Sequence, residues 1–314
     1  MKNFGIIGIG GYIAPRHLKA IKETGNKVIA ALDPHDSVGI IDSFFPKAKF
    51  FTEFERFDRH CEKIRRNDSQ EKIDYLTICS PNYLHDSHIR FGLRIGANVI
   101  CEKPIVLNPR NVSNLIELEK ESGKKVYTVL QLRYHQSIIA LKNKIEKNKD
   151  KKYKVELTYI TPRGDWYLHS WKGNIEKSGG IATNIGIHFF DMLLWIFGPV
   201  KSKKVFLSEA KKMSGHLELE NADVKWYLST DSKDLPKKNI ENNSPYRSIK
   251  VNDEEIEFSK GFTELHTETY KQILNGNGFR IKDAEPSISL VSQLRDSTAE
   301  KIDKNKAHYM LKNE

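Results

Sequence analysis

Cysteine and long apolar runs are scarce in this sequence. Its 314 residues contain three cysteines, Cys61, Cys79 and Cys101, and no two of them have the spacing of a metal-binding pair. We therefore expect buried free thiols in a reducing compartment and no bound metal. No stretch approaches the roughly 20 apolar residues that cross a bilayer, and the glycine-broken start is too short for a secretory signal. These absences predict a cytoplasmic protein with no membrane partner.

Acidic residues are in deficit. The chain has 51 lysines and arginines against 41 aspartates and glutamates, a formal net charge of +10. Such a balance can attract nucleic acid, a membrane surface or an anionic small molecule. The lysines are spread along the chain, with local runs at 142–154, 201–212 and 233–238, and they are not interleaved with aromatic residues. Solvated surface charge is therefore the first interpretation, an anionic substrate the second and nucleic acid a distant third.

The first 135 residues alternate between strand and helix patterns, which predicts a parallel sheet. Strand-like runs lie at 4–8, 27–32, 74–79, 98–101 and 125–130. Helical spacing of apolar residues lies between them, at 12–24, 54–64, 83–95 and 109–122. The fold class is therefore α/β, with an N-terminal Rossmann domain over residues 1–135.

The pattern changes after a lysine-rich helix at 137–150. A strand at 153–160 and an apolar helix at 179–197 precede several strand-like runs, the last at 254–258, with no long helix between them. Such a series favours an open, mostly antiparallel sheet, so residues 136–314 are expected to form a second, α+β domain. Residues 231–245 are polar and contain proline, which predicts a surface insertion. Helices at 264–274 and 284–302 close the chain, and its last dozen residues are expected to fray.

A glycine-rich turn lies between the first strand and the first helix. Gly8, Gly10 and Gly11 allow a tight turn that lets the backbone approach a pyrophosphate, and the helix N-terminus offers unpaired N–H groups. Ile13 stands where such turns usually have glycine or alanine. Asp33 ends the second strand 22 residues after Gly11, where a carboxylate can accept hydrogen bonds from an adenosine ribose and repel a 2′-phosphate. The pattern predicts an NAD site; the alternative is an aspartate that merely begins a turn.

Two further groups can move protons. Lys103 follows a predicted strand, where ligands sit in parallel sheets, and a nearby nicotinamide cation would disfavour its protonated form. The alternative is a surface lysine paired with Glu102. Asn184, His188 and Asp191 are spaced by four and three residues, so they share one helix face. There the imidazole could take a proton from an alcohol while the aspartate orients the ring, or the histidine could be a core residue tied to that carboxylate.

Four stretches together carry a resemblance to a known family. They are the glycine-rich start, Ser80-Pro81-Asn82 with His85, Glu102-Lys103-Pro104, and the run from Gly180 through Asn184, Gly186 and His188 to Asp191. In this order they resemble the glucose–fructose oxidoreductase, inositol dehydrogenase and rhizopine catabolism family, over essentially the whole chain. Within that family, the stretches similar to the UDP-N-acetyl-glucosaminuronic acid 3-dehydrogenases are Gly11–His17, Ile78–His85, Arg163–Gly173 and Ala182–Gly186.

The resemblance implies NAD-dependent oxidation of the C3 hydroxyl of UDP-N-acetyl-glucosaminuronic acid to a 3-keto sugar nucleotide. In that subgroup a pyridoxal-phosphate aminotransferase converts the product towards a diacetamido uronic acid of surface polysaccharide (O-antigen). In some members NADH stays bound and is reoxidised by 2-oxoglutarate. The second domain's sheet is then expected to cover the substrate and to mediate a homo-dimer or homo-tetramer.

The resemblance also assigns site residues. Lys103 and His188 would be the catalytic pair. The cofactor-binding set would be Gly8, Gly10, Gly11, Tyr12, Ile13, Asp33, Ser80, Pro81, Asn82, His85, Glu102, Lys103 and Gln131. The substrate-binding set would be Arg163, Trp166, Tyr167, Lys172, Thr183, Asn184 and His188. Arg163 and Lys172 would supply cations for a carboxylate and a diphosphate; a structural loop anchored by tryptophans is the alternative.

One position departs from the family. Many relatives have aspartate four residues before the histidine, whereas this chain has Asn184, an amide that can hold a hydroxyl but cannot act as a base. Proton transfer therefore rests on Lys103 and His188. The rival hypotheses are an NAD-dependent dehydrogenase of a free cyclitol or aldose, and a non-catalytic NAD-binding regulator, against which the presence of both residues argues. A nucleic-acid binder is motivated only by the net charge of +10.

Overall fold

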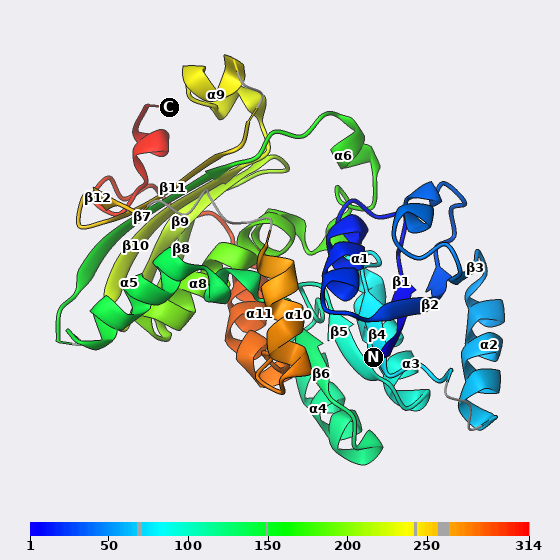
Figure 1. Cartoon of the computed structure of the whole chain (residues 1–314). Helices are drawn as coiled ribbons and strands as arrows, with labels where there is room; N and C mark the ends of the chain where they lie inside the picture. Colours follow the sequence, from blue (N-terminus) through cyan, green and yellow to red (C-terminus); the bar gives the residue numbers. More distant parts are fainter. Residues whose placement is uncertain (68–70, 149, 242–243, 257–263, 314) are drawn as a thin grey trace. The chain divides into compact units, whose positions relative to one another are not determined.

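The computed structural model describes residues 1–67, 71–148, 150–241, 244–256 and 264–313. Contacts divide the chain into two compact units, one of residues 1–131 and 263–285 and the other of residues 132–262 and 286–314. Each unit has its own sheet (Figure 1). A single boundary after residue 135 does not describe this division, because the chain returns to the first unit after the second sheet is complete.

The first unit is built around a parallel sheet of six strands. In chain order they are β1 (Asn3–Ile7), β2 (Lys27–Leu32), β3 (Lys49–Phe51), β4 (Tyr75–Ile78), β5 (Asn98–Cys101) and β6 (Val126–Thr128). Their order in the sheet is β3-β2-β1-β4-β5-β6, and every neighbouring pair is parallel. The short apolar runs suit such a sheet, since all five residues of β1 are buried. The expected Rossmann architecture is confirmed, and β3 is a strand that the sequence pattern did not reveal.

Helices alternate with these strands as the apolar spacing predicts. They are α1 (Ala14–Glu23), α2 (Phe54–Arg66), α3 (His85–Arg94) and α4 (Arg110–Ser122), with 3₁₀ turns η1 (Gly39–Ser43) and η2 (Asn82–Leu84). The returning helix α10 (Leu265–Leu274) also belongs to this unit. Its Tyr270 lies in the same buried cluster as Phe4 of β1, and Thr267 Oγ1 donates a hydrogen bond to Glu23 Oε2 of α1 (2.7 Å). α10 is therefore packed into the Rossmann unit through α1.

The second unit contains a sheet of six strands. They are β7 (Tyr153–Ile160), β8 (Val200–Ser208), β9 (Lys212–Leu219), β10 (Ala222–Ser229), β11 (Tyr246–Val251) and β12 (Glu254–Glu255). Their order is β12-β11-β7-β10-β9-β8, and only the β7–β10 pair among them is parallel. The expected mostly antiparallel sheet is confirmed. The end of the run expected at 254–258 lies outside the described residues.

Helices pack on one face of this sheet (Figure 1). The chain's remaining helical elements are η3 (Gln131–Tyr134), α5 (Gln136–Glu146), α6 (Trp166–His169), α7 (Ile175–Ser178), η4 (Ala182–Gly186), α8 (Ile187–Phe197), η5 (Ser232–Asp234), α9 (Lys237–Glu241), α11 (Ile281–Arg295) and η6 (Tyr309–Asn313). The rings of α8 face those of the strands: Phe189 contacts Tyr159 with centroids 4.6 Å apart, and Phe190 contacts Trp226 at 5.2 Å. The apolar face predicted for this helix is thus its contact with the sheet.

The helix expected over residues 179–197 is present, but its first part is π-helical. η4 makes this wider turn and α8 continues it. Among the described residues one helical stretch, Ile175–Phe197, is long and apolar enough to cross a membrane, and 72% of its most apolar window is buried. The expectation that no stretch comes near that length is therefore corrected, although the burial is that of a core helix.

Two polar segments contain side chains that pack against the second sheet. In the insertion at 231–245, Leu235 is buried, and Asp234 Oδ2 accepts hydrogen bonds from Tyr227 (3.0 Å) and Ser229 (2.5 Å) of β10. The fraying expected for the last dozen residues is wrong for the described part around Ala307, His308 and Leu311, which are buried. Both segments cover part of the sheet, so their polar composition concealed a few apolar anchors.

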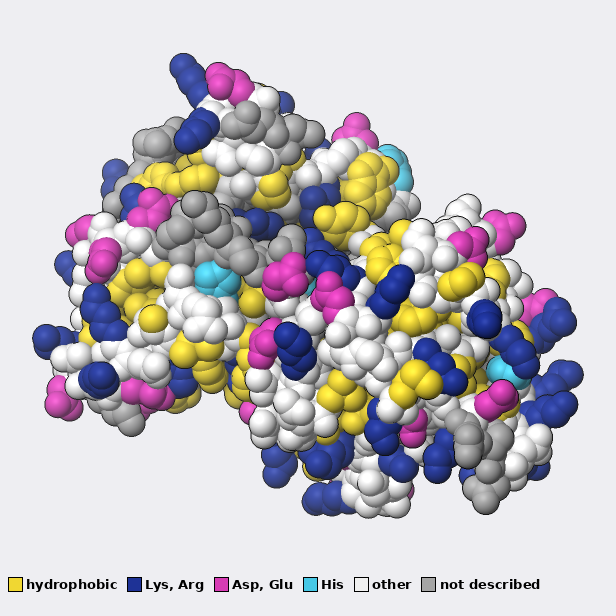
Figure 2. Space-filling view, viewed as in Figure 1, with side chains coloured by type: hydrophobic (Ala, Val, Ile, Leu, Met, Phe, Trp, Pro, Cys, Tyr) yellow, Lys and Arg dark blue, Asp and Glu magenta, His cyan; other side chains and the backbone are white. Residues whose placement is uncertain are grey.

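Surface charge is dispersed. Figure 2 shows Lys and Arg side chains scattered over the visible face among Asp and Glu side chains. Several of them pair on the surface of one helix, as Glu62 does with Arg65 and Arg66 of α2. This is the pattern of solvated surface charge, the first of the three interpretations of the basic balance.

Candidate active site

The residues predicted to bind a cofactor follow the carboxyl ends of neighbouring strands. Gly8 follows β1, Asp33 follows β2, Ser80 comes after β4, Glu102 follows β5 and Gln131 comes after β6. These five strands are adjacent and parallel, so the residues line one edge of the first unit's sheet. Ligands of open α/β sheets bind outside this edge at the point where the strand order reverses, which here lies between β1 and β4.

The turn after β1 requires glycine at position 8 and packs Gly10 tightly against Asp33. Gly8 has a φ of 85°, and a Cβ on it would lie 2.6 Å from the backbone of Cys79 and Ser80. Gly10 donates its N–H to Asp33 Oδ2 (2.8 Å), and a Cβ on Gly10 would lie 3.1 Å from that oxygen. The two ends of the predicted dinucleotide pattern, the glycines and the acid, are therefore in direct contact.

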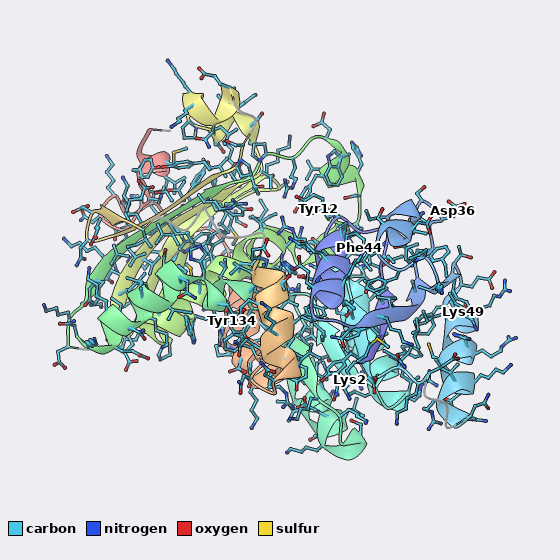
Figure 3. All side chains as sticks on the ribbon, viewed as in Figure 1. Lys2, Tyr12, Asp36, Phe44, Lys49 and Tyr134 are labelled. Atoms are coloured by element: carbon cyan, nitrogen blue, oxygen red, sulfur yellow. The ribbon has the colours of Figure 1, made fainter. Side chains whose placement is uncertain are left out.

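The start of α1 can receive an anion. The N-cap position, Ile13, provides no side-chain hydrogen bond, and the first turn contains no acidic residue. The backbone N–H groups of Tyr12 and Ile13 have no partner among the described residues. The Tyr12 side chain is 85% exposed beside this turn, at the end of α1 in Figure 3. Unpaired N–H groups and the helix dipole together favour a phosphate at this place.

Asp33 suits the ribose of NAD. Its side chain is buried, with Oδ2 accepting from Gly10 and Oδ1 accepting from the N–H of His35 (3.0 Å). These donors fix the carboxylate and leave each oxygen a lone pair for a hydroxyl. A 2′-phosphate would meet a buried negative charge here. The residues present therefore fit NAD better than NADP.

His85 joins the loops that follow β4 and β5. Its Nε2 lies 2.8 Å from the carbonyl oxygen of Ser80, and its Nδ1 lies 2.6 Å from that of Pro104. Burial lowers the pKa of His85, although both carbonyl contacts oppose this effect. Ser80 Oγ is held in turn by His88 Nδ1 (2.9 Å), and Asn82 is buried at the start of η2. His88 and His85 therefore hold the Ser80-Pro81-Asn82 loop in place. His85 would affect a bound cofactor only indirectly, by fixing the loops after β4 and β5.

Lys103 is half-buried at the end of β5, and the peptide bond that joins it to Pro104 is cis. Its N–H donates to Glu102 Oε2 (3.3 Å). Glu102 is buried, and its Oε1 lies 2.9 Å from His17 Nε2 and 3.3 Å from His266 Nε2. Burial by itself would raise the pKa of Glu102, but the hydrogen bonds from the two histidines hold this pKa well below its usual range. Glu102 is thus an internal carboxylate and not the surface partner of a lysine.

His17 and His266 were not among the site residues predicted from the sequence. His17 stands on the apolar face of α1, and a buried polar side chain needs a hydrogen-bond partner, so its position was a usable signal. His266 is 164 residues from Glu102 along the chain, and no local pattern links the two.

Gln131 presents a buried acceptor. Its Oε1 has no hydrogen-bond partner among the described residues, and neither does Thr128 Oγ1 of β6. An unsatisfied buried acceptor costs roughly 1–3 kcal/mol, so a ligand that donates a hydrogen bond here would be favoured. An amide-bearing nicotinamide is such a ligand.

In the second unit, Asn184 and His188 are half-exposed positions within an otherwise buried stretch. Asn184 Nδ2 donates to Tyr167 Oη (2.6 Å), and burial raises the pKa of this tyrosine. The amide therefore holds a hydroxyl, as its chemistry allows, and ties η4 to α6. Thr183 Oγ1 is buried without a partner in the described part of the chain.

Asp191 is held by a residue that the sequence did not suggest. Its carboxylate accepts hydrogen bonds from Arg133 Nε (2.9 Å) and Nη2 (2.8 Å), and both side chains are buried. Asp191 therefore anchors α8 to η3. Asp191 is buried, whereas His188, three residues earlier on the same helix, is partly exposed.

The loop that carries Arg163 places a second cation against two tryptophans. Lys172 Nζ lies 4.5 Å from the ring centroid of Trp171 and 5.4 Å from that of Trp166. Burial and the charge of Arg163 lower the pKa of Lys172. Arg163 and Trp166 are exposed. Both tryptophans therefore hold Lys172, while Arg163 stays exposed on the same loop.

The predicted residues fall into two sets, one in each unit. The dinucleotide turn, Asp33 and Lys103 are assembled in the first unit, and the residues around His188 in the second. Within each set the structure brings partners together, as it does for Gly10 with Asp33 and for Asn184 with Tyr167.

Comparisons with curated proteins give the same division. The model of an oxidoreductase family with an NAD-binding Rossmann fold matches residues 2–130, and the model of that family's C-terminal alpha/beta domain matches residues 142–259. Inositol 2-dehydrogenase of Rhizobium meliloti is 25% identical over 195 residues, which are 62% of this chain and 54% of the relative. The matched stretches span between 37% and 63% of the length of the curated relatives.

A comparison with solved structures extends over nearly the whole chain. The WlbA (WbpB) dehydrogenase of Thermus thermophilus is 48% identical, with a TM-score of 0.94, and the match covers 98% of this chain and 99% of that one. That dehydrogenase was crystallised with NAD and UDP-GlcNAcA, and also with NAD and alpha-ketoglutarate. The chain therefore belongs to the oxidoreductase family of glucose–fructose oxidoreductase and inositol dehydrogenase, and it is an enzyme with an NAD-binding Rossmann domain.

Proposed function

We propose that this chain oxidises the C3 hydroxyl of UDP-N-acetyl-glucosaminuronic acid (UDP-GlcNAcA) with NAD⁺ and forms the 3-keto sugar nucleotide. The observation that carries the proposal is the 48% identity, over 98% of the chain, to a dehydrogenase crystallised with both NAD and UDP-GlcNAcA. The charge and the chemistry of the predicted residues suit this substrate.

Each predicted group has a role in this reaction. The turn Gly10–Ile13 holds the pyrophosphate, and Asp33 accepts hydrogen bonds from the adenosine ribose. Bound NAD⁺ would accept the hydride that leaves C3. The hydroxyl proton passes to Lys103 or His188, because both side chains can accept a proton when neutral. Arg163 and Lys172 balance the charges of the carboxylate and the diphosphate.

We also propose 2-oxoglutarate as the electron acceptor, since the Thermus dehydrogenase was also crystallised with alpha-ketoglutarate. Its ketone would take the hydride and a proton, which gives 2-hydroxyglutarate and restores NAD⁺. The 3-keto product suits a biosynthetic route to a diacetamido uronic acid of O-antigen. On this proposal the enzyme acts in the cytoplasm as a homo-dimer or homo-tetramer, and it needs neither a membrane nor nucleic acid.

Mass spectrometry tests the reaction directly. Purified protein with NAD⁺ and UDP-GlcNAcA, incubated with and without 2-oxoglutarate, should yield a sugar nucleotide that has lost two hydrogens. If the product depends on 2-oxoglutarate and 2-hydroxyglutarate accumulates with it, the cofactor is recycled on the enzyme. Protein that binds NAD and yields no oxidised sugar nucleotide under either condition would refute the proposal.

The variant Lys103→Ala tests whether Lys103 takes part in the chemical step. Removal of the amine should lower turnover by roughly 100-fold or more, in the range seen for a general base. NAD affinity, measured by calorimetry, should stay close to that of the wild type. Wild-type turnover in this variant would remove Lys103 from the catalytic pair and leave His188.

A free cyclitol or aldose is the second candidate substrate. It is favoured by the match to inositol 2-dehydrogenase, which is 25% identical over 62% of this chain. Such a substrate carries no charge, so it would leave Arg163 and Lys172 without a role. Reduction of NAD⁺ by myo-inositol or glucose, but not by UDP-GlcNAcA, would select this candidate.

A further inference from the structure

Three buried histidines hold the residues on either side of Lys103. His17 and His266 contact the carboxylate of Glu102, which precedes it, and His85 contacts the carbonyl oxygen of Pro104, which follows it. We call these three residues the histidine clamp. Each of them is almost completely inaccessible to solvent. None of the three is positioned at the surface, where it could meet a sugar.

The hydrogen bonds of the clamp define where its protons lie. Glu102 Oε1 accepts from Nε2 of both His17 and His266, so each ring carries its proton on Nε2. His17 Nδ1 is then an acceptor, and it lies 2.9 Å from the hydroxyl of Tyr270. That hydroxyl in turn accepts from Thr77 Oγ1 (2.8 Å). Burial lowers the pKa of His17, which favours its neutral ring, and Glu102 carries the negative charge of the network.

The Glu102 carboxylate also accepts a hydrogen bond from the backbone of Lys103. Its other oxygen, Oε2, accepts the backbone N–H of Lys103 (3.3 Å). One oxygen of Glu102 is thus fixed by α1 and α10, while the other fixes the peptide that carries the lysine. A carboxylate held by three donors is a rigid support, since rotation about its last bond would break these hydrogen bonds.

We propose that His17 and His266 are positioning residues for Lys103, which act by clamping Glu102 at the end of β5. The inference rests on the proposed function, because it assigns Lys103 to the reaction. It also gives a reason for the return of the chain to the first unit, since α10 delivers His266 from 164 residues away. His17 lies on α1, whose N-terminal turn is the proposed pyrophosphate site, so cofactor and lysine share one support.

Glu102 and the two histidines that contact it also have the composition of a metal site. His17, Glu102 and His266 offer ligand atoms that all lie within 4.8 Å of one another. The distance of 2.9 Å between His17 Nε2 and Glu102 Oε1 is that of a hydrogen bond with one shared proton. His17 also has Tyr270 on its other nitrogen, which completes its hydrogen bonding without a cation. Protons therefore account for the contacts of both rings with Glu102, while His266 Nδ1 has no hydrogen-bond partner among the described residues.

Three variants of α10 separate positioning from simple packing. His266→Phe keeps an aromatic ring but removes the donor to Glu102, whereas His266→Gln returns an amide donor near the place of Nε2. Thr267→Val is the matched control, because Thr267 bonds Glu23 of α1 and makes no contact with Glu102. For each protein one measures kcat and KM with UDP-GlcNAcA, NAD affinity by calorimetry, and the rate at which Lys103 reacts with an amine-specific reagent.

The positioning role predicts a distinct set of results. His266→Phe should lower kcat by about 10- to 100-fold, as expected for a small misplacement of a reacting group, with NAD affinity changed by less than about twofold. The reactivity of Lys103 should change in the same variant. His266→Gln should recover most of kcat, and Thr267→Val should match the wild type throughout.

Other outcomes would overturn the inference. Unchanged kcat and unchanged Lys103 reactivity in His266→Phe would show that Glu102 needs no clamp. Equal losses in the Phe, Gln and Val variants would mean that α10 acts only by packing, and one equivalent of tightly bound metal in the purified enzyme would replace the clamp by a metal site. A wild type that does not oxidise UDP-GlcNAcA refutes the proposed function instead, and the reactivity of Lys103 still decides the inference.

Discussion

Gly8 carries two constraints that can be separated by experiment. Its φ of 85° is left-handed, and a Cβ on it would lie 2.6 Å from the backbone of Cys79 and Ser80. Gly25, at the end of α1, has a similar φ of 72° with no atom within 4 Å of a Cβ. Gly8→Ala should therefore lower the free energy of unfolding by about 2–4 kcal/mol, and Gly25→Ala by about 1 kcal/mol.

Urea unfolding of the two variants measures the difference. Both substitutions place an alanine at a positive φ, so this part of the lost stability is common to the two variants. The additional loss in Gly8→Ala measures the collision of the new Cβ with the backbone of Cys79 and Ser80. NAD affinity should fall only in Gly8→Ala, since Gly8 begins the turn proposed for the pyrophosphate. Equal destabilisation of the two variants would mean that the turn shifts without cost and that the close approach has no energetic role.

Single residues were predictable where their partners are near in sequence or follow a known spacing. The glycine-rich turn and Asp33 were picked out because their spacing in a βαβ unit follows a known pattern, although the hydrogen bond between Gly10 and Asp33 was not predicted. The contacts of Glu102 with His17 and His266 span 85 and 164 residues, and no spacing rule reaches so far. A buried carboxylate needs donors, but the sequence does not say which helix supplies them.

At the scale of elements, the pair Arg133–Asp191 fixes α8 to η3. Both side chains are buried and joined by two hydrogen bonds of 2.8 and 2.9 Å. Removal of one partner leaves the other charge buried, which typically costs about 3–5 kcal/mol. Arg133→Met and Asp191→Leu should each destabilise the second unit by about this amount, whereas the double variant should lose much less.

A double-mutant cycle in urea gives the coupling between the two side chains. If the double variant lost the sum of the two single losses, the residues would act independently and the pair would not anchor the helix. A selective fall in turnover in both single variants, without loss of stability, would instead link Asp191 to His188 on the same helix.

Elements were predicted well where side-chain periodicity defines them and poorly where it does not. The apolar run of α8 predicted a helix, but the π-helical turn of η4 changes the hydrogen-bond register and leaves the apolar pattern almost intact. β3 has three residues, fewer than a period-2 pattern needs to be recognised. The insertion at 231–245 contains one buried apolar side chain, Leu235, too few to stand out in a polar segment.

For the molecule as a whole, the sequence predicted the two architectures but not the path between them. The fold class follows from the order of strands and helices, which is a local property. The division into units depends on contacts between distant segments, such as α10 with α1, and the packing of His308 against Thr158 of β7 (2.9 Å) is of the same kind. Composition alone assigned the C-terminal segment to solvent, although a few buried side chains were enough to fold it onto the sheet.

Buried neutral histidines make the stability of the first unit depend on pH. Burial lowers the pKa of His88 to about 4, and it also lowers the pKa values of His17 and His85. In the unfolded chain a histidine titrates near 6.5, so between these values the unfolded state binds a proton that the folded state does not. The contribution of these neutral histidines to the free energy of unfolding is therefore fully present above pH 6.5. It is lost as the pH falls from 6.5 toward 4.

The variant His88→Asn isolates one of these groups. Asparagine does not titrate in this range, and its amide can replace Nδ1 as the partner of Ser80 Oγ. Between pH 7.5 and 4.5, His88 should account for a loss of about 2–3 kcal/mol in the free energy of unfolding, a loss that the variant does not suffer. Urea unfolding of both proteins at the two pH values measures it. If wild type and variant lost equal stability, His88 would accept its proton in the folded state, and the loop at Ser80 would have to open to let water reach the ring.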